Sequence, residues 1–531
     1  MPPAKALILG TMLCTPCASA YAQSAENTPK IGYADVLAIA EQGRDAGSAG
    51  SNQIGAVVIT GNEAVDDVKY QAVVEAYFGE PLTDEMLERL NDELVTLAKE
   101  EGYPYARASI DEDAAALGIV QIEMDEGRIE DVAISGYQNA MARQTLGALI
   151  GRPANRDELE RTLLLVSDIP SVQLAGAKLR RINGRNVLEV ALKERTSEWR
   201  IDVDNYGTES FGPIRTSATA RVAEVLSSAD EVRGTLRLNP LEPDELLFAS
   251  ASYQTQLTQS GVTLRVAGGI GSTDPGGALD GSDINGDTLS ANVQVSAPIR
   301  RTKDASAWIE GEMAYISIEQ DDLGAMLRDD TLVTAAVGLR TRFAFAGGFA
   351  RTSVRIERGL GILGATRLGD PFASRFDGDG VYTKVRFNAD ARVPLVKRLD
   401  LYFAAGGQVA DRPLLASEEI GLGGAYRTRG YDFAEVLGDE GIYGLLELRY
   451  NFDARDLPFD FLQLYAFVDG GTVSDIDQTG SEGSLFSAGP GVRARLGILD
   501  FEVESAFPLG GSGERQPSDD PEFNIRAGVN F

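Results

Sequence analysis

Histidine is absent from the 531 residues of this chain, and cysteine occurs only twice. Without imidazole, neither a Ser-His-Asp triad nor a His-ligated metal site can form. Basic residues are also scarce: Lys and Arg number 49 against 80 Asp and Glu, a formal net charge of −31. This balance argues against a nucleic-acid partner, because such proteins present a basic surface to the phosphates. We therefore expect no metal, no cofactor, no nucleic acid and no enzyme activity.

The N-terminus has the features of a secretory signal peptide. Lys5 precedes an apolar stretch at residues 6–13, and small residues suited to cleavage lie at positions 18–22, which predicts a signal peptide over residues 1–22. Both cysteines, Cys14 and Cys17, fall inside it, so the mature chain has no disulfide framework. Residues 23–52 follow as a leader segment and linker. No later run of 18 apolar residues occurs, so the exported chain is either soluble or a membrane β-barrel.

Residues 53–196 repeat one order of elements twice. The apolar pattern predicts a strand, two helices and two strands, and then the same order again. The first set covers residues 54–61, 67–78, 83–101, 106–111 and 118–125, and the second covers residues 128–136, 138–150, 155–167, 172–182 and 186–194. Thr83 is expected to cap one helix, and Asn155 with Glu158 to open another as a capping pair. The sequence thus predicts two α+β modules, at residues 53–126 and 127–196.

The helical period ends near residue 196, and alternation of apolar and polar residues follows to the C-terminus. In the last segment, apolar side chains recur at every second position, namely at Phe523, Ile525, Ala527, Val529 and Phe531. We count sixteen such segments over residues 197–531, joined by connections that are in turn short and long. This pattern is typical of an outer-membrane barrel whose short turns and both ends face the periplasm. A soluble β-sandwich would alternate too, but the number of strands and the loop asymmetry favour a sixteen-stranded antiparallel transmembrane barrel.

Several short strings in this order resemble a known superfamily. They are GYPYARA at residues 102–108, GIVQI at 118–122, EGRI at 126–129, LERTLLL at 159–165, DIP at 168–170 and DNYG at 204–207. Together with two β-α-α-β-β modules before a sixteen-stranded barrel, they resemble the POTRA-plus-barrel translocases of the outer membrane. Within that superfamily the chain is most similar to the two-partner secretion transporters, the haemolysin secretion/activation (TpsB) family. The resemblance covers nearly all of the mature chain.

The resemblance assigns a motif to the long loop before the twelfth barrel strand. The loop reads GGAYRTRGY at residues 423–431, with Arg429, Gly430 and Tyr431 matching the Arg-Gly-aromatic core of the family. The family usually has valine where this chain has Thr428. Gly430 would allow close backbone approach, and Tyr431 would pack in the lumen.

The partner of this loop is expected on the thirteenth barrel strand. The family motif Phe-x-Asp-x-Gly appears there as Phe467, Asp469 and Gly471. The alternation of this strand independently turns Asp469 into the lumen, where the folded-in loop would present Arg429 to it as a charge-assisted pair, a geometry that allows bidentate contact. The simpler interpretation is that Arg429 is a solvated loop cation and Asp469 one of many lumen acids.

The resemblance implies that the modules bind a secreted partner protein in the periplasm and that the barrel passes it outward. That partner would be a large exoprotein with an N-terminal secretion domain. Two alternatives are an insertase of the same superfamily, which folds other barrels into the membrane, and a passive diffusion porin. A porin would not need the modules.

Binding of the partner is expected at an exposed strand edge of a module, where an extended chain can add as a further strand. The candidate strands are residues 106–111, with Ala106, Arg107 and Ile110, and residues 172–182, with Leu174 and Leu179. Other expected partners are outer-membrane lipid and, through the terminal Phe531, the barrel assembly machinery.

Overall fold

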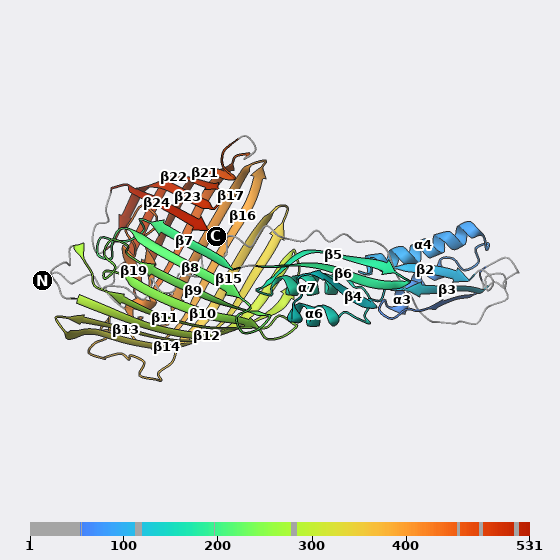
Figure 1. Ribbon diagram of the computed structural model, residues 1–531, viewed down its shortest axis with the longest axis horizontal. Coiled ribbons are helices and arrows are strands. Elements are labelled where there is room, and N and C mark those ends of the chain that lie inside the picture. Colours follow the sequence, from blue (N-terminus) through green and yellow to red (C-terminus); the bar gives the residue numbers. More distant parts are fainter. Residues whose placement is uncertain are drawn as a thin grey trace. The chain divides into compact units, whose positions relative to one another are not determined.

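The computed structural model describes residues 54, 56–111, 119–195, 197–277, 284–453, 457–476, 482–513 and 520–531. The predicted signal peptide and the leader up to residue 52 lie outside these residues. The chain divides into two compact units, the tandem modules and the barrel. Figure 1 shows that the α-helices in the described residues belong to the modules, while the barrel is built from strands.

The first module is a three-stranded sheet packed against two helices. Its elements are β1 (Ala56–Thr60), α3 (Asp67–Glu75), α4 (Asp84–Glu100), β2 (Arg107–Asp111) and β3 (Ile119–Asp125). The strand order is β1-β3-β2, with β1 parallel to β3. As expected, the side chain of Thr83 caps α4, accepting a hydrogen bond of 3.3 Å from the amide of Met86. Leu90 and Leu94 of α4 lie fully buried in the core of this module.

The second module repeats the arrangement. Its elements are β4 (Asp131–Gly136), α6 (Ala140–Gly147), α7 (Arg156–Ser167), β5 (Val172–Ile182) and β6 (Arg185–Glu194), in the sheet order β4-β6-β5. Asn155 caps α7 by accepting from the amides of Asp157 and Glu158. The Glu158 carboxylate contacts Arg152, whereas a reciprocal capping pair would turn it towards the amide of Asn155. The first strand begins at Asp131, later than the predicted residue 128.

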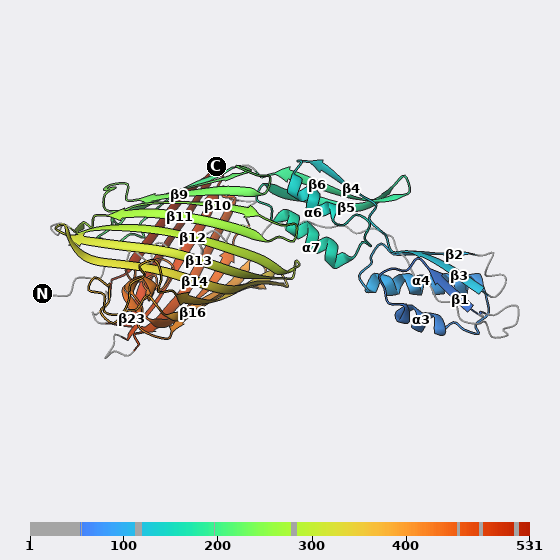
Figure 2. The same cartoon turned by 90° about the horizontal axis from the view of Figure 1, so that it is seen from below.

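The barrel closes with sixteen strands, which confirms the predicted fold class. They are β7 (Glu198–Asp204), β8 (Arg215–Ala223), β9 (Asp230–Leu238), β10 (Leu247–Gln256), β11 (Thr263–Thr273), β12 (Ile284–Arg301), β13 (Ala305–Asp322), β14 (Ala325–Phe345), β15 (Gly348–Gly359), β16 (Thr383–Val396), β17 (Leu399–Ala410), β20 (Glu440–Asn451), β21 (Phe461–Ser474), β22 (Gly483–Leu496), β23 (Leu499–Ser512) and β24 (Glu522–Asn530). Each strand pairs antiparallel with its neighbours, as Figure 2 shows for β9 to β14, and β24 pairs with β7 to close the wall (Figure 1). Because the barrel is closed, no strand in its wall has a free edge.

The outer surface of the barrel is apolar, and its inner surface is polar. On β14, for example, Val337, Leu339 and Phe343 are exposed, while Arg340 and Arg342 alternate with them. This is the pattern of a barrel in lipid, because lipid takes the outer face and water or polar side chains take the inner one. None of the described helices is long and apolar enough to cross a membrane.

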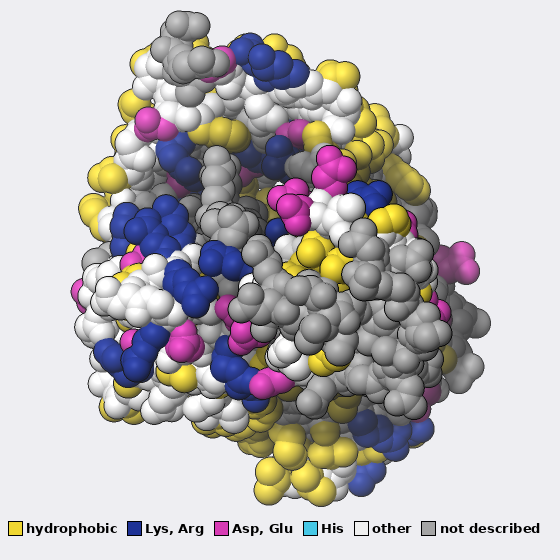
Figure 3. Space-filling view, turned by 90° about the vertical axis from the view of Figure 1, so that its right-hand side faces the viewer, with side chains coloured by type: hydrophobic (Ala, Val, Ile, Leu, Met, Phe, Trp, Pro, Cys, Tyr) yellow, Lys and Arg dark blue, Asp and Glu magenta, His cyan; other side chains and the backbone are white. Residues whose placement is uncertain are grey.

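Charged side chains of both signs mix on the face of the molecule drawn in Figure 3. Groups of Lys and Arg side chains (dark blue) alternate there with Asp and Glu (magenta) and with apolar side chains (yellow). Within the barrel many such charges are paired across strands. The guanidinium of Arg351 on β15, for example, donates to both carboxylate oxygens of Asp390 on β16, at 2.8–3.1 Å.

Candidate functional site

The motif loop, residues 411–439, connects β17 to β20 and carries the predicted Arg-Gly-Tyr motif. It contains a 3-10 turn, η2 (Ala416–Glu418), and two short strands, β18 (Ile420–Leu422) and β19 (Val436–Gly438). The two strands pair antiparallel with each other. The loop therefore has a stem, in which its two arms are hydrogen-bonded, and a tip at residues 423–435.

Two unusual backbone positions shape the tip. Gly423 has φ of +107°, and a Cβ atom there would lie 1.9 Å from the carbonyl oxygen of Asp432, so only glycine fits. Thr428 has φ of +55°, an unfavourable region for a β-branched residue. Its Oγ1 accepts a hydrogen bond of 2.7 Å from the amide of Gly423. Threonine thus gives this tip a bond across its base that a valine has no atom to make.

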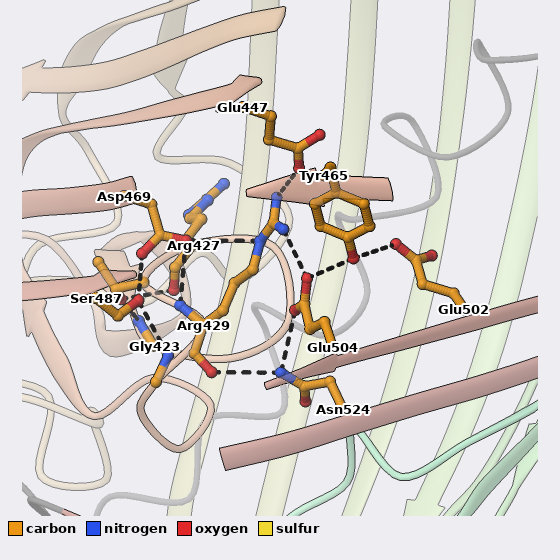
Figure 4. Close-up of polar contacts among 12 residues, drawn as sticks. Gly423, Arg427, Arg429, Glu447, Tyr465, Asp469, Ser487, Glu502, Glu504 and Asn524 are labelled. Carbon is orange, nitrogen blue, oxygen red and sulfur yellow. Dashed lines mark hydrogen bonds and ion pairs between the residues drawn. The ribbon is translucent and has the colours of Figure 1, made fainter. Parts of the chain in front are cut away.

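Arg429 leaves the tip and ends among lumen-facing carboxylates (Figure 4). Its side chain is only 6% exposed. One terminal nitrogen, Nη2, lies 2.5 Å from Glu447 on β20, and the other, Nη1, lies 2.7 Å from Glu504 on β23. The guanidinium carbon lies 4.3 Å from the centre of the Phe467 ring, a cation–π contact. The simpler interpretation of Arg429 as a solvated loop cation does not fit this burial.

Asp469 contacts Arg429 differently from the expected bidentate pair. The Nε atom of Arg429 lies 3.5 Å from Oδ2 of Asp469, and the same oxygen accepts from the backbone amide of Arg429 at 3.4 Å. The other carboxylate oxygen accepts a hydrogen bond from the Ser487 hydroxyl. The arrangement is not bidentate because both terminal nitrogens of the guanidinium contact Glu447 and Glu504. Asp469 therefore contacts both the backbone amide and the guanidinium of Arg429.

The residues after Arg429 are fitted closely against the wall. A Cβ atom on Gly430 would lie 2.9 Å from Cβ of Ser487, and the Gly430 amide donates to the Ser487 hydroxyl at 3.1 Å. Tyr431 is buried, and its hydroxyl donates to the carbonyl of Phe486 at 3.1 Å. Gly471 on β21 likewise leaves room for the loop, since a Cβ atom there would lie 2.8 Å from the side chain of Leu422.

Further charges complete what we call the tip cluster, defined as Arg429, Arg449, Arg493, Glu447, Asp469 and Glu504. Glu447 also accepts from Arg449 at 2.6 Å and from Arg493 at 3.1 Å. Glu504 accepts in addition from the Tyr465 hydroxyl at 2.8 Å. Arg493 also donates to Glu502 at 2.7 Å, so every charge of the cluster has at least one partner of opposite sign. Such pairing is what allows charges to stay buried.

Sequence reasoning missed four of the residues that contact the loop: Glu447, Ser487, Glu504 and Asn524. Asn524 on β24 donates to the carbonyl of Arg429 at 3.4 Å and to Glu504 at 3.2 Å. The one available signal was that these residues fall on the lumen side of the alternation. Many other polar residues share that side, so the signal does not single them out.

The predicted edge residues lie on or beside edge strands of the modules. Ala106 is buried and precedes β2, while Arg107 is exposed and Ile110 half-buried on β2 itself. On β5, Leu174 and Leu179 are buried in the module core. In the described residues, β2 pairs only with β3, and β5 only with β6. Recognition at β5 would thus rest on its backbone and on the exposed side chains between the buried leucines.

The fold and the tip cluster define a class of protein, the POTRA-plus-barrel transporters of the outer membrane, in which a loop is held inside the lumen by ion pairs. The family profile described as haemolysin secretion/activation protein ShlB/FhaC/HecB matches residues 185–494, and a ShlB-type POTRA domain matches residues 53–127. The chain belongs to this haemolysin secretion/activation family. It is an outer-membrane protein with periplasmic POTRA modules.

The individual relatives that match this chain are named as transporters. The outer membrane transporter CdiB of Dickeya dadantii is 23% identical over 453 residues, covering 81% of this chain and 78% of its own length. The heme/hemopexin transporter protein HuxB of Haemophilus influenzae is 20% identical over 401 residues, covering 72% and 68%. Among solved structures, CdiB from Escherichia coli superposes with a TM-score of 0.77 at 19% identity, covering 92% of this chain and 93% of that one.

Proposed function

We propose that this chain is the outer-membrane pore of a two-partner system. It binds one secreted protein in the periplasm through its POTRA modules and passes that protein outward through the barrel. The observation that carries the proposal is the way the lumen is obstructed. The motif loop is held inside by hydrogen bonds and ion pairs to β20, β21, β22, β23 and β24, with no covalent restraint. A restraint of this kind can be released and remade, as a transport cycle requires.

The partner protein binds first at the edge of β5. Backbone hydrogen bonds give the affinity when an extended chain adds to a sheet, so a longer edge offers more of them. β5 has 11 residues, against 5 in β2. Along β5, exposed Lys178 and Arg180 alternate with buried Ala177 and Leu179. The two basic side chains would contact an acidic or polar segment of the added strand.

Deletion of residues 53–196 tests the role of the modules. The barrel wall closes through its own strand pairs, so the truncated chain should insert in the outer membrane and show heat-modifiable mobility. Secretion of a partner exoprotein expressed together with this chain should be lost. Secretion at the level of the full chain would overturn the proposal.

Cysteine cross-linking tests the edge itself. The chain has no cysteine after Cys17, so a single introduced cysteine is unambiguous. Lys178→Cys lies on β5, and Ser135→Cys is a matched exposed position on β4, the opposite edge of the same sheet. An exoprotein bearing cysteines in its secretion domain should cross-link to the first variant and not to the second. The reverse result would assign binding to β4 and exclude β5.

The proposal includes two further partners in the outer membrane, lipid and the barrel assembly machinery. The outward-facing Val and Leu side chains of the barrel contact lipid, as expected for this fold. The terminal Phe531 is 65% exposed and is paired through its backbone with Trp199, at 2.9 and 3.3 Å. Its free side chain is the element we assign to recognition by the barrel assembly machinery. Phe531→Ala should lower the amount of inserted barrel without changing secretion per inserted molecule.

A further inference from the structure

A second ionic cluster lies at the stem of the motif loop, apart from the tip cluster. We call it the stem cluster and define it as Arg375, Glu419, Asp439 and Asp475. The three carboxylates come from the two arms of the motif loop and from the residue after β21. Arg375 comes from a different loop, residues 360–382, which connects β15 to β16. One guanidinium therefore joins three separate segments of the chain.

The contacts of Arg375 with the stem cluster converge on one nitrogen, while its Nε and Nη2 atoms donate to Asp377 of its own loop at 3.3 and 3.2 Å. Its Nη1 donates to Glu419, lies 2.8 Å from Asp439 and lies 3.7 Å from Asp475. The side chain of Asp439 is fully buried and accepts two backbone hydrogen bonds, from Leu414 at 2.7 Å and from Ile476 at 3.0 Å. This carboxylate thus ties both arms of the stem to the end of β21.

The three carboxylates are close enough to repel one another strongly. Oxygens of Glu419, Asp439 and Asp475 lie within 4.8 Å of one another, a spacing at which such groups can share a cation. Arg375 supplies that positive charge in this structure. Without it, three acids would face each other at a mostly buried site, where unpaired charges are costly.

Arg375 is itself fixed to the barrel wall through its loop. The amide of Ser374, the residue before it, donates to Asp330 of β14 at 3.0 Å. Nearby, the amide of Thr331 donates to the hydroxyl of Thr366 at 2.8 Å. Ser374 also accepts a hydrogen bond from the amide of Ala416, in the first arm of the motif loop, at 3.0 Å. The stem is therefore attached to β14 through residues 360–382, in addition to its bonds to Gln408 of β17 and to the end of β21, whereas the tip is attached to strands β20 to β24.

We propose that Arg375 is a positioning residue of the pore: by supplying the positive charge that the three carboxylates of the stem cluster share, it keeps the motif loop inside the barrel mouth while the tip is free to move. The proposal rests on the proposed function, since a moving tip is what secretion requires. When the tip cluster opens, only residues 423–435 leave their contacts, and the stem stays in place. Loss of Arg375 lets the stem separate as well, so the pore is open without cargo.

The test measures ion conductance of the purified full-length chain in planar bilayers, with no exoprotein present. Arg375→Ala should raise the open probability several-fold above wild type. Because the three carboxylates are then left without their cation, about 1 mM CaCl2, a range in which weak protein sites bind calcium, should return it towards wild type. Free guanidinium should act in the same way. A merely structural loss of packing would not respond to either cation.

Matched variants complete the test. Arg367→Ala removes an exposed arginine from the same loop and should leave conductance unchanged. Arg375→Lys keeps one positive charge and is the variant to rely on where Arg375→Ala does not insert. Its open probability should lie above wild type, because a single ammonium cannot reproduce the planar guanidinium contacts. Wild-type conductance in both Arg375 variants, or an increase that calcium and guanidinium leave unchanged, would overturn the proposal.

The outcome is separable from that of the proposed function. Raised, cation-sensitive conductance in Arg375→Ala supports the role of Arg375 even in a chain that secretes no partner. Normal secretion by the wild type with unchanged conductance in the variants would leave the transporter function standing and remove the role of Arg375.

Discussion

The modules and the barrel both alternate apolar and polar residues, but the apolar side chains face inward in the modules and outward in the barrel. In the modules the buried side chains are apolar, as with Leu90, Leu94 and Ile122, and water covers the outside. In the barrel the buried side chains include the charged Lys384 and Glu447, while leucines and valines are exposed. The difference teaches that period alone sets which residues share a face. The surrounding medium decides which face is apolar.

A second consequence concerns how each region is held together. The module cores are stabilised by apolar burial, which is not directional. The barrel interior is held by ion pairs and hydrogen bonds, which fix one geometry and lose their value when a single partner is removed. Function that depends on opening and closing is therefore expected in the barrel.

The largest effect is expected from Arg429→Ala, which should abolish secretion. Removing one partner from a buried ionic cluster typically costs about 3–5 kcal/mol, because the remaining charges stay uncompensated. The cost falls on the loop, since the strand pairs of the wall are untouched. Barrel insertion and heat-modifiability should be normal, while secretion is lost and conductance rises.

Two companions sharpen this prediction. Arg429→Lys should also fail to secrete normally, because one ammonium cannot reach Glu447 and Glu504 together in the way the guanidinium does. Asp469→Ala should lose secretion, and the double variant with Arg429→Ala should be no worse than Arg429→Ala alone, because residues in one network are not additive. Wild-type secretion by Arg429→Ala would reduce the residue to an ordinary loop cation.

A smaller effect is expected when one leucine is replaced by alanine in the first module and, separately, in the barrel. Leu90→Ala in the first module should lower the free energy of unfolding of residues 53–195 by about 2–5 kcal/mol, because it leaves a cavity in a fully buried core. Leu339→Ala on β14 removes an exposed, outward-facing side chain and should leave the barrel inserted and heat-modifiable. Denaturant titration of the modules and gel mobility of the barrel measure the pair. Equal sensitivity of the two positions would contradict the comparison.

The smallest effect concerns Glu126, a buried carboxylate of the first module. It accepts from the amides of Glu63, Ala64 and Val65 at 3.0, 2.7 and 3.3 Å. Burial raises the pKa of Glu126 above its ordinary value, although the three amides oppose this. The folded module therefore holds the proton more tightly than the unfolded chain does. This contribution to stability is full below the unfolded pKa, about 4.3, and is lost as the pH rises through the higher folded pKa.

Glu126→Gln is the test of that pH dependence. The amide oxygen of glutamine still accepts from the backbone, but the side chain no longer titrates. Urea titrations of residues 53–195 between pH 4 and 7 should show the wild type losing stability relative to Glu126→Gln as the pH rises. A difference that stays constant with pH would show that Glu126 does not titrate in this range.

Most of the fold could be predicted from the sequence, because the signals for helix ends and strands are local. Thr83 and Asn155 cap their helices as their residue types predict, and sixteen strands follow from alternation. Both signals depend on neighbours a few residues away. The capping role of Glu158 was predicted wrongly, because its carboxylate contacts Arg152 instead, a competition that a local pattern does not contain.

The sequence by itself determined the two modules, the barrel and the side of β21 on which Asp469 lies, because period and turn length need no knowledge of distant residues. Only the tertiary structure decided which charges meet. Arg429 contacts Glu447 and Glu504, which are 18 and 75 residues away along the chain, and Arg375 meets Asp439 and Asp475 across separate loops. Many acidic residues lie on the lumen side of the strand alternation, and the closure of the barrel brings particular ones together. Charge partners in this protein are thus set by the geometry of the wall.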